Sequence, residues 1–159
     1  MVHKRNVLFL CTHNSARSQM AEAFLKKHGG DCFDAYSAGL EPTEIDPMTR
    51  EVMQEVGIEM EGQHAKGMET YLGRLMVHHL IIVCEEANRN CPHTWPGLEI
   101  EERLFWPIED PVATQGAYRE RLHKFRQARD RIEERIKSWL RENHEHDELD
   151  VRRGRGVHR

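Results

Sequence analysis

Cys11 and Arg17 are the residues whose types and spacing most directly indicate chemistry. Five short or polar residues, 12–16, separate them, and an apolar run over residues 7–10 leads directly into Cys11. A cysteine thiolate is a nucleophile, and the planar guanidinium of arginine binds two oxygens of a tetrahedral oxyanion at once. The pair therefore predicts a site in which Cys11 attacks an oxyanion that Arg17 holds. The alternative is a buried cysteine at a strand end and an unrelated surface arginine, and the spacing alone does not decide between them.

The elements expected around this pair favour the chemical interpretation. Residues 6–11 are typical of a buried strand and residues 15–27 of an amphipathic helix. Cys11 would then lie at the carboxyl edge of a sheet, where open α/β folds bind ligands. Free N–H groups of the loop and of the helix N-terminus form a nest for an anion. The predicted oxyanion-binding residues are Thr12, His13, Asn14, Ser15, Ala16, Arg17 and Ser18.

The same positive surroundings bear on the reactivity of Cys11. Amide N–H groups and Arg17 are expected to lower the pKa of the Cys11 thiol and to leave a thiolate at neutral pH. Ser18 is expected to donate a hydrogen bond to that sulfur.

Short apolar strands alternate with helices along most of the chain. Strands are predicted over residues 6–11, 32–39 and 78–84 and from residue 103 onward, and helices over residues 15–27, 47–56, 68–72 and 117–140. The signals for the second helix are Asp46-Pro47 at its start and Gly57 after its end. This alternation predicts an α/β sandwich with a parallel sheet.

Length, charge and cysteine content exclude several classes of protein. The chain has 159 residues, which is enough for one domain, and a net charge of −4 from 23 basic and 27 acidic residues, which gives no basic field for nucleic acid. No apolar run approaches the roughly 18 residues of a membrane span, and the run at 7–10 is too short for an export signal. Four cysteines in a chain of this length are not a secreted disulfide framework. We therefore expect a cytoplasmic protein.

The composition changes near residue 142. We expect one domain over residues 1–141 and a charged tail over residues 142–159, whose first half is acidic and whose second half is basic. So few apolar residues predict a disordered tail. The alternative is an arm that binds anions or nucleic acid.

The segment "CTHNSARS", residues 11–18, resembles the phosphate-binding loop of low-molecular-weight tyrosine phosphatases and of the arsenate reductases that share their fold. Further segments resemble thioredoxin-coupled arsenate reductases in the same order, namely residues 14–24, 36–58, 84–92 and 105–111. The resemblance covers roughly residues 5–140. It implies a flavodoxin-like three-layer sandwich with four parallel strands flanked by helices.

Cys84 and Cys91 distinguish the two classes. Cys84 ends the strand predicted over residues 78–84, so it is expected at the same sheet edge as Cys11. A phosphatase needs neither cysteine, whereas a reductase needs one thiol to resolve the arsenic adduct and another to carry the disulfide outward. The resemblance implies this relay, with thioredoxin as electron donor. The alternatives are a chance pair of cysteines and a metal pair. Zinc is disfavoured, because zinc ligands usually lie two to four residues apart and need two further ligands.

Asp110 is the candidate for the acid that protonates the leaving group. In both related classes an Asp-Pro near the last strand supplies this residue, and Glu109 ranks second. A turn before the last helix is the structural alternative, and it is compatible with the catalytic one. Phosphatases of this fold usually carry aromatic residues after this point, where the chain has Val112-Ala113.

Three functions remain open at this level. The first is arsenate reduction with Cys11, Arg17, Cys84, Cys91 and Asp110 as catalytic residues. The second is hydrolysis of phosphotyrosine or small aryl phosphates by Cys11, Arg17 and Asp110, which we also expect as a slow side activity. The third is a non-catalytic phosphate-binding module.

The reductase interpretation carries expectations for ligands. Arsenate is the expected substrate, with phosphate and sulfate as competing oxyanions, for a monomer that binds neither nucleic acid nor membrane and requires no cofactor. Asn14, Glu22 and Ser37 resemble positions that hold potassium in some family members, but the expected aspartate is absent near residues 65–67, so no complete metal site is predicted. Cys32 is expected in the core.

Overall fold

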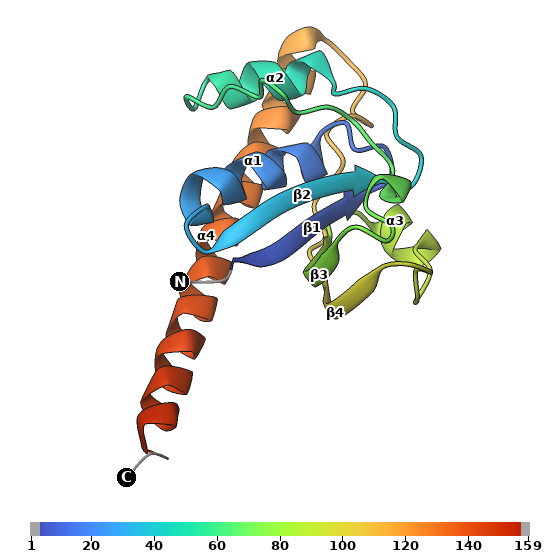
Figure 1. Cartoon of the computed structure of the whole chain (residues 1–159). Coiled ribbons are helices and arrows are strands. Elements are labelled where there is room, and N and C mark those ends of the chain that lie inside the picture. The colour runs from blue at the N-terminus through green and yellow to red at the C-terminus, as the bar shows by residue number, and fades with distance from the viewer. Residues whose placement is uncertain (1–3, 157–159) are drawn as a thin grey trace.

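The structure is a computed structural model that describes residues 4–156, with side chains described for residues 4–143. Four parallel strands form one sheet in the order β2-β1-β3-β4 (Figure 1). The strands are β1 (Arg5–Cys11), β2 (Phe33–Gly39), β3 (Met76–Ile82) and β4 (Glu99–Phe105). The predicted parallel four-stranded α/β fold is therefore confirmed, with the strand order typical of flavodoxin-like sheets.

The two central strands carry the core. Residues 7–10 of β1 and residues 80–82 of β3 are completely buried, which explains why both segments are continuous apolar runs. The edge strand β4 begins at Glu99, four residues before the predicted start at 103. Three of its first four residues are exposed glutamates, so the sequence contains no apolar signal for a strand there.

Helices cover both faces of the sheet (Figure 1). On one face α1 (Arg17–Gly29) packs on β1, β2 and the long helix α4 (Tyr118–Gly156). On the other face the short helix η1 (Met68–Thr70) leads into Tyr71, whose ring packs edge-on against Tyr36 of β2. Helix α2 (Pro47–Gln54) packs on α4. No helix among residues 4–156 is long and apolar enough to cross a membrane.

Helix starts follow their local signals with two differences. Asp46 caps α2 by accepting a hydrogen bond from Met48 N, with Pro47 at the first helical position, as predicted. Helix α1 begins at Arg17 rather than Ser15, because Ser15 and Ala16 still belong to the loop. A short helix not expected from the sequence, α3 (Glu85–Asn90), follows Cys84, whose sulfur accepts a hydrogen bond from Ala87 N.

Two further expectations differ from the structure. Cys32 is exposed in the turn between α1 and β2 and is not a core residue, because the strand starts one residue later, at Phe33. Helix α4 does not end near residue 140 but continues to Gly156, past the predicted boundary at 142. The segment 141–153 contains no proline or glycine to stop a helix. Residues 157–159 of the predicted tail lie outside the described residues.

An ionic cluster joins α2 to α4. The Glu55 carboxylate accepts hydrogen bonds from Arg126, whose closest nitrogen lies at 2.6 Å, and from Arg129 at 2.8 Å. The hydrogen bonds from Arg126, and secondly those from Arg129, lower the pKa of Glu55 from 4.5 to about 2.

Glu55→Gln is expected to destabilise the protein in a pH-dependent way. Because the pKa of Glu55 is lowered on folding, its stabilising contribution is present above 4.5 and is lost as the pH falls towards 2. Urea unfolding should show that the wild type is more stable than the variant at neutral pH. The difference in the free energy of unfolding should vanish as the pH approaches 2. Glu59→Gln, at an exposed carboxylate, is the control. A pH-independent difference would contradict the assignment.

Candidate active site

The loop after β1 turns its carbonyl groups outward. The carbonyls of Cys11, Thr12, His13 and Ser15 accept hydrogen bonds, at 2.7–3.1 Å, from the backbone N–H groups of Leu40, Glu41, Thr43 and Asp46, respectively. The remaining carbonyl, that of Asn14, accepts from Gln19 Nε2 at 3.2 Å. Because C=O and N–H point in opposite directions across a trans peptide, the loop amides face the inside of the loop. This is the geometry that an anion nest requires.

Asn14 fixes the shape of the loop with its backbone and its side chain. Its φ of +53° is left-handed, a conformation that asparagine tolerates better than most residues. Its side-chain oxygen accepts from Gln19 Nε2 at 2.8 Å and from Lys66 N at 3.0 Å, and its Nδ2 donates to Ser18 Oγ at 2.8 Å. Asn14 thus turns the backbone of the loop and ties the loop to Ser18, Gln19 and Lys66.

Cys11 lies at the centre of the loop and is only 3% exposed. Its sulfur is 2.8 Å from Ser18 Oγ and accepts a hydrogen bond from Asn14 N at 3.1 Å. Burial raises the pKa of the Cys11 thiol above its ordinary value, while the Ser18 hydroxyl, the Arg17 charge and the Asn14 amide act in the opposite direction. The expectation of a lowered pKa is therefore wrong in direction, because desolvation of the thiolate outweighs the hydrogen bonds.

Arg17 and Asp110 form an ion pair in the wall of a cavity. Arg17 donates from Nη1 to the Ile108 carbonyl at 2.9 Å, and its Nη2 is 3.6 Å from Asp110 Oδ1. Arg17, Cys84 and Asp110 all line this cavity, which has a volume of about 410 Å³. Asp110 keeps 42% of its side chain exposed, so it can exchange protons with solvent.

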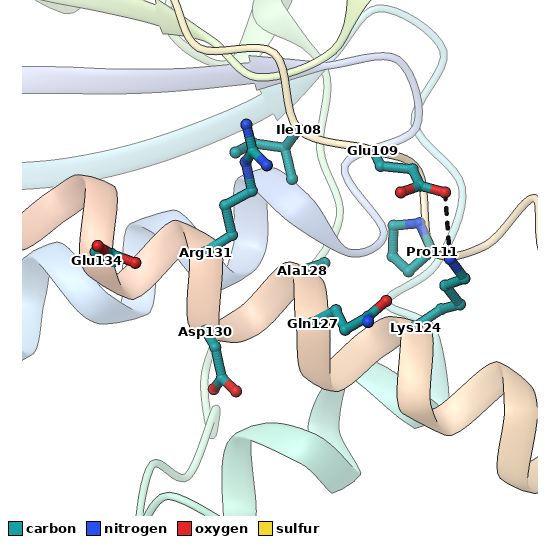
Figure 2. A pocket seen from close by; sticks show the side chains of 9 residues that line it. All are labelled: Ile108, Glu109, Pro111, Lys124, Gln127, Ala128, Asp130, Arg131 and Glu134. Atoms are coloured by element: carbon teal, nitrogen blue, oxygen red, sulfur yellow. Dashed lines mark ion pairs between the residues drawn. The ribbon is translucent and has the colours of Figure 1, made fainter.

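Glu109, the second-ranked acid, also borders this cavity, but its carboxylate pairs with a lysine of α4 and not with Arg17. Its carboxylate pairs with Lys124 of α4 at 3.6 Å, facing a separate cavity between α4 and residues 108–111 (Figure 2). Asp110 is thus the carboxylate paired with Arg17.

The register of the sheet brings Cys84 to the loop. Leu10 of β1 pairs with Ile82 of β3, so Cys84 lies one residue beyond the position opposite Cys11. Its sulfur is 3.5 Å from Thr12 Oγ1, and the residue is buried. Both cysteines therefore reach the same sheet edge, as predicted. Cys84 does not end the strand as expected, however, because β3 ends at Ile82 and Cys84 caps α3.

Cys91 lies at the other end of α3. It is the residue after the helix, it is buried, and its sulfur accepts a hydrogen bond from Trp95 Nε1 at 3.4 Å. Cys84 and Cys91 are thus the N-cap and the C-cap of one short helix.

Sequence reasoning missed the residues that support the loop. The segment 40–46, Gln19 and Lys66 show no catalytic pattern in the sequence, since they act through backbone groups or single contacts across the fold. Trp95, which donates a hydrogen bond to the Cys91 sulfur and not to the loop, was missed for the same reason. The only available signal was that residues 36–58 as a whole resembled one family.

Comparison with known proteins agrees with this geometry. The family described as low molecular weight phosphotyrosine protein phosphatase matches residues 6–150. An arsenate reductase of Halalkalibacterium halodurans is 37% identical over 139 residues, which cover 87% of this chain and 96% of that protein.

Solved structures give the same result. An arsenate reductase in the phosphate-binding state is 31% identical with a TM-score of 0.71, covering 87% of this chain and 98% of that chain. A thioredoxin-dependent arsenate reductase of Corynebacterium glutamicum is 26% identical with a TM-score of 0.64, covering 87% of this chain and 61% of that chain.

Gly39→Ala should damage the loop. A Cβ at Gly39 would lie 2.8 Å from Thr12 O and 2.9 Å from Asn14 N, both backbone atoms that cannot rotate away. We expect a loss of about 1–3 kcal/mol in stability together with weaker sulfate binding, measured by thermal unfolding and calorimetry. Gly67→Ala is the matched control, because its Cβ would meet only the flexible Glu69 carboxylate. Equal behaviour of the two variants would show that the close approach is unimportant.

Ser18→Ala should raise the pKa of Cys11 further, because the Ser18 hydroxyl is the largest influence that lowers it. Alkylation of Cys11 by iodoacetamide should then be slower at neutral pH, with its pH–rate profile displaced to higher pH. The exposed Cys32 in the same sample is the internal reference. An unchanged Cys11 profile would mean that the hydroxyl does not stabilise the thiolate.

Proposed function

Because the chain belongs to the low-molecular-weight phosphotyrosine protein phosphatase family, within its arsenate reductase branch, we propose that it reduces arsenate to arsenite by a relay of three cysteines. Cys11 is the nucleophile, Cys84 and then Cys91 resolve the adduct, and thioredoxin restores the thiols. The observation that carries the proposal is the position of Cys84, buried one residue beyond the strand neighbour of Cys11 and lining the cavity of Arg17 and Asp110.

The first step forms the arsenic–sulfur bond. The loop amides and Arg17 hold the arsenate oxygens. Since burial raises the pKa of Cys11, the thiol gives its proton to the bound arsenate anion as it attacks. An As–O bond breaks, and the oxygen leaves as water with a proton that Asp110 supplies and then recovers. This step changes no oxidation state.

The second and third steps transfer the electrons. The Cys84 thiolate attacks Cys11 Sγ, an S–S bond forms, and the S–As bond breaks with its electron pair left on arsenic. Arsenic(V) thereby becomes arsenic(III), and two thiols become a disulfide. Cys91 then attacks Cys84 and frees Cys11. The Cys84–Cys91 disulfide is reduced by the dithiol of thioredoxin, which requires a reducing compartment such as the cytoplasm.

This relay requires α3 to unwind. Cys91 lies seven positions after Cys84 along the chain, which corresponds to roughly 10 Å of helical rise, whereas a disulfide needs Cα atoms within about 7 Å. Only Ala87 is buried within α3, so opening the helix exposes little apolar surface. The short length of α3 supports a segment that moves during each turnover.

Hydrolysis of aryl phosphates is the second candidate, because Cys11, Arg17 and Asp110 form its complete machinery without the other cysteines. A tyrosine phosphatase would not use Cys84 or Cys91. We therefore propose hydrolysis as a slow side activity and arsenate reduction as the principal one.

Cys84→Ser and Cys91→Ser separate these functions. Each variant should lose multiple-turnover arsenate reduction with thioredoxin and yet hydrolyse p-nitrophenyl phosphate, which needs only Cys11, Arg17 and Asp110. In a single turnover without added thiol, Cys84→Ser should release little arsenite, whereas Cys91→Ser should release one equivalent and stop as a Cys11–Cys84 disulfide. Peptide mapping by mass spectrometry identifies the disulfide.

Cys32→Ser is the control and should behave as the wild type, because Cys32 is exposed and outside the site. Arsenate-dependent NADPH oxidation with thioredoxin and its reductase measures turnover. If wild type makes arsenite while Cys84 and Cys91 both stay open to alkylation, the relay is refuted and external thiols resolve the adduct.

A further inference from the structure

Glu22 of α1 is a buried carboxylate beneath the oxyanion loop. Its side chain is 4% exposed. Glu22 Oε1 accepts a hydrogen bond from Ser37 Oγ at 3.0 Å, and Oε2 lies 3.0 Å from Lys26 Nζ. A buried carboxylate needs positive charge nearby to remain ionised, and Lys26 is 53% exposed, so it is surrounded largely by water.

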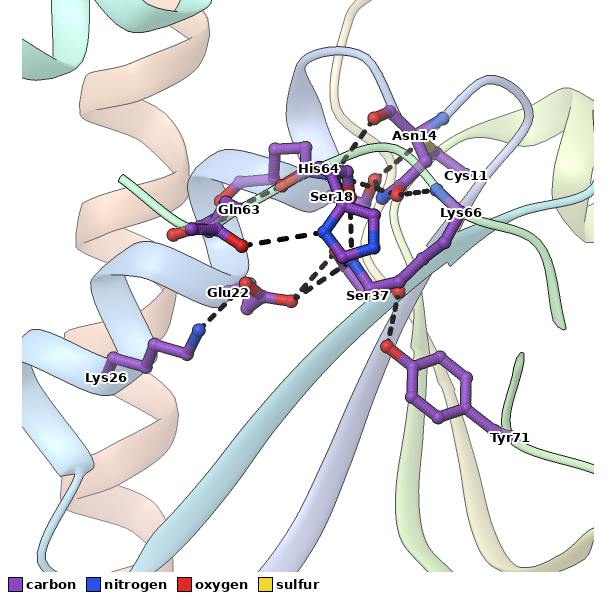
Figure 3. A network of polar contacts seen from close by, with 12 residues as sticks. Cys11, Asn14, Ser18, Glu22, Lys26, Ser37, Gln63, His64, Lys66 and Tyr71 are labelled. Atoms are coloured by element: carbon purple, nitrogen blue, oxygen red, sulfur yellow. Dashed lines mark hydrogen bonds and ion pairs between the residues drawn. The ribbon is translucent and has the colours of Figure 1, made fainter. Parts of the chain in front are cut away.

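The second cation at Glu22 is the ammonium group of Lys66, whose side chain is largely buried, unlike that of Lys26. Lys66 Nζ lies 3.9 Å from Glu22 Oε1 and donates to the His64 carbonyl at 2.8 Å, with only 13% of the side chain exposed (Figure 3). The Lys66 ammonium thereby links the segment after α2, through the His64 carbonyl, to Glu22 of α1.

The backbone of Lys66 is tied to the loop itself. Lys66 N donates to Asn14 Oδ1 at 3.0 Å, and the Lys66 carbonyl accepts from Gly39 N at 2.8 Å. Asn14 in turn bonds Ser18, whose hydroxyl contacts the Cys11 sulfur. One residue therefore connects the charge of Glu22 with the residue that shapes the loop (Figure 3).

These residues do not fit the potassium ion that some family members hold at the similar positions. The Asn14 side-chain oxygen already accepts two N–H groups, and the Ser37 hydroxyl is already committed to Glu22. A potassium ion against Glu22 Oε1 would also lie close to the Lys66 ammonium and be repelled by it. Among the described residues, no group of three or more histidine, cysteine or acidic side chains is arranged to hold a metal.

We propose that the Lys66 ammonium is the built-in cation of this site. It neutralises Glu22 and positions Asn14, so that the oxyanion loop keeps its shape without a bound monovalent cation. Lys66 is a positioning residue, because it acts on the oxyanion through Asn14 and the loop.

The first test uses the wild type and does not depend on arsenate being the substrate. Sulfate affinity by calorimetry and the melting temperature are measured, with all thiols reduced, in potassium chloride and in tetramethylammonium chloride at equal ionic strength. We expect the same values in both salts. A tighter sulfate affinity or a higher melting temperature specific to potassium would overturn the proposal.

The second test removes the charge. Lys66→Met keeps the length of the side chain and should weaken sulfate binding by about tenfold, as expected for an interaction worth about 1.4 kcal/mol. Potassium, but not tetramethylammonium, should partly restore the affinity, because Glu22 then lacks its internal cation. Lys66→Arg retains the charge and should bind sulfate more tightly than Lys66→Met.

The matched control is Lys26→Met, which removes the exposed cation from the same carboxylate. It should bind sulfate as the wild type does and show no response to potassium. The cation-specific rescue is the decisive measurement, since a purely structural defect would not distinguish the two salts. Lys66→Met with wild-type affinity, or with a loss that potassium does not change, would refute the assignment. An inactive reductase that still shows this salt pattern would contradict the proposed function alone.

Discussion

The hydrogen bonds between the loop carbonyls and the segment 40–46 are the constraint on which the site depends. Anion binding by backbone amides needs several N–H groups aimed at one point, and each of these is fixed only if the carbonyl of the same peptide is held on the opposite side. Strand β2 supplies that support because Cys11 pairs with Gly39, so the segment after β2 runs along the outside of the loop. The missing side chain at Gly39 allows the approach. The parallel sheet is thus a prerequisite for the chemistry as well as for stability.

Burial and charge have different effects at Cys11 and at Glu22, the two ends of the hydrogen-bond network that runs through Asn14 and Lys66. At Cys11, desolvation raises the pKa of the nucleophile despite Ser18, Arg17 and Asn14. In the proposed mechanism the bound anionic substrate accepts the thiol proton, so Cys11 becomes a thiolate only as it attacks. At Glu22 the buried charge stays paired with ammonium groups, and the network serves the geometry of the loop.

The placement of the cysteines combines a rigid part with a part that moves. Cys11 and Cys84 are fixed by neighbouring central strands, so the first disulfide of the proposed relay forms at the edge of the sheet. Cys91 is held at the far end of α3, where Trp95 binds its sulfur. Because helix geometry keeps Cys84 and Cys91 too far apart for a disulfide, the helix would keep the thiol of Cys91 apart until the third step of the proposed relay.

The sequence by itself determined the features that local pattern encodes. Apolar runs predicted the central strands, and Asp46-Pro47 marked the start of α2. Strand-end cysteines and the spacing to Arg17 predicted the oxyanion loop. The sequence did not predict α3, because its six residues include only one apolar residue, Ala87, and so show no apolar periodicity, and because the helix is capped by Cys84. Only the tertiary structure decided the direction of the pKa shift at Cys11, the exposure of Cys32, and the roles of Gly39 and Lys66. The physical reason is that desolvation, close backbone approach and charge pairing depend on segments distant in the chain, and no local pattern records which of them meet.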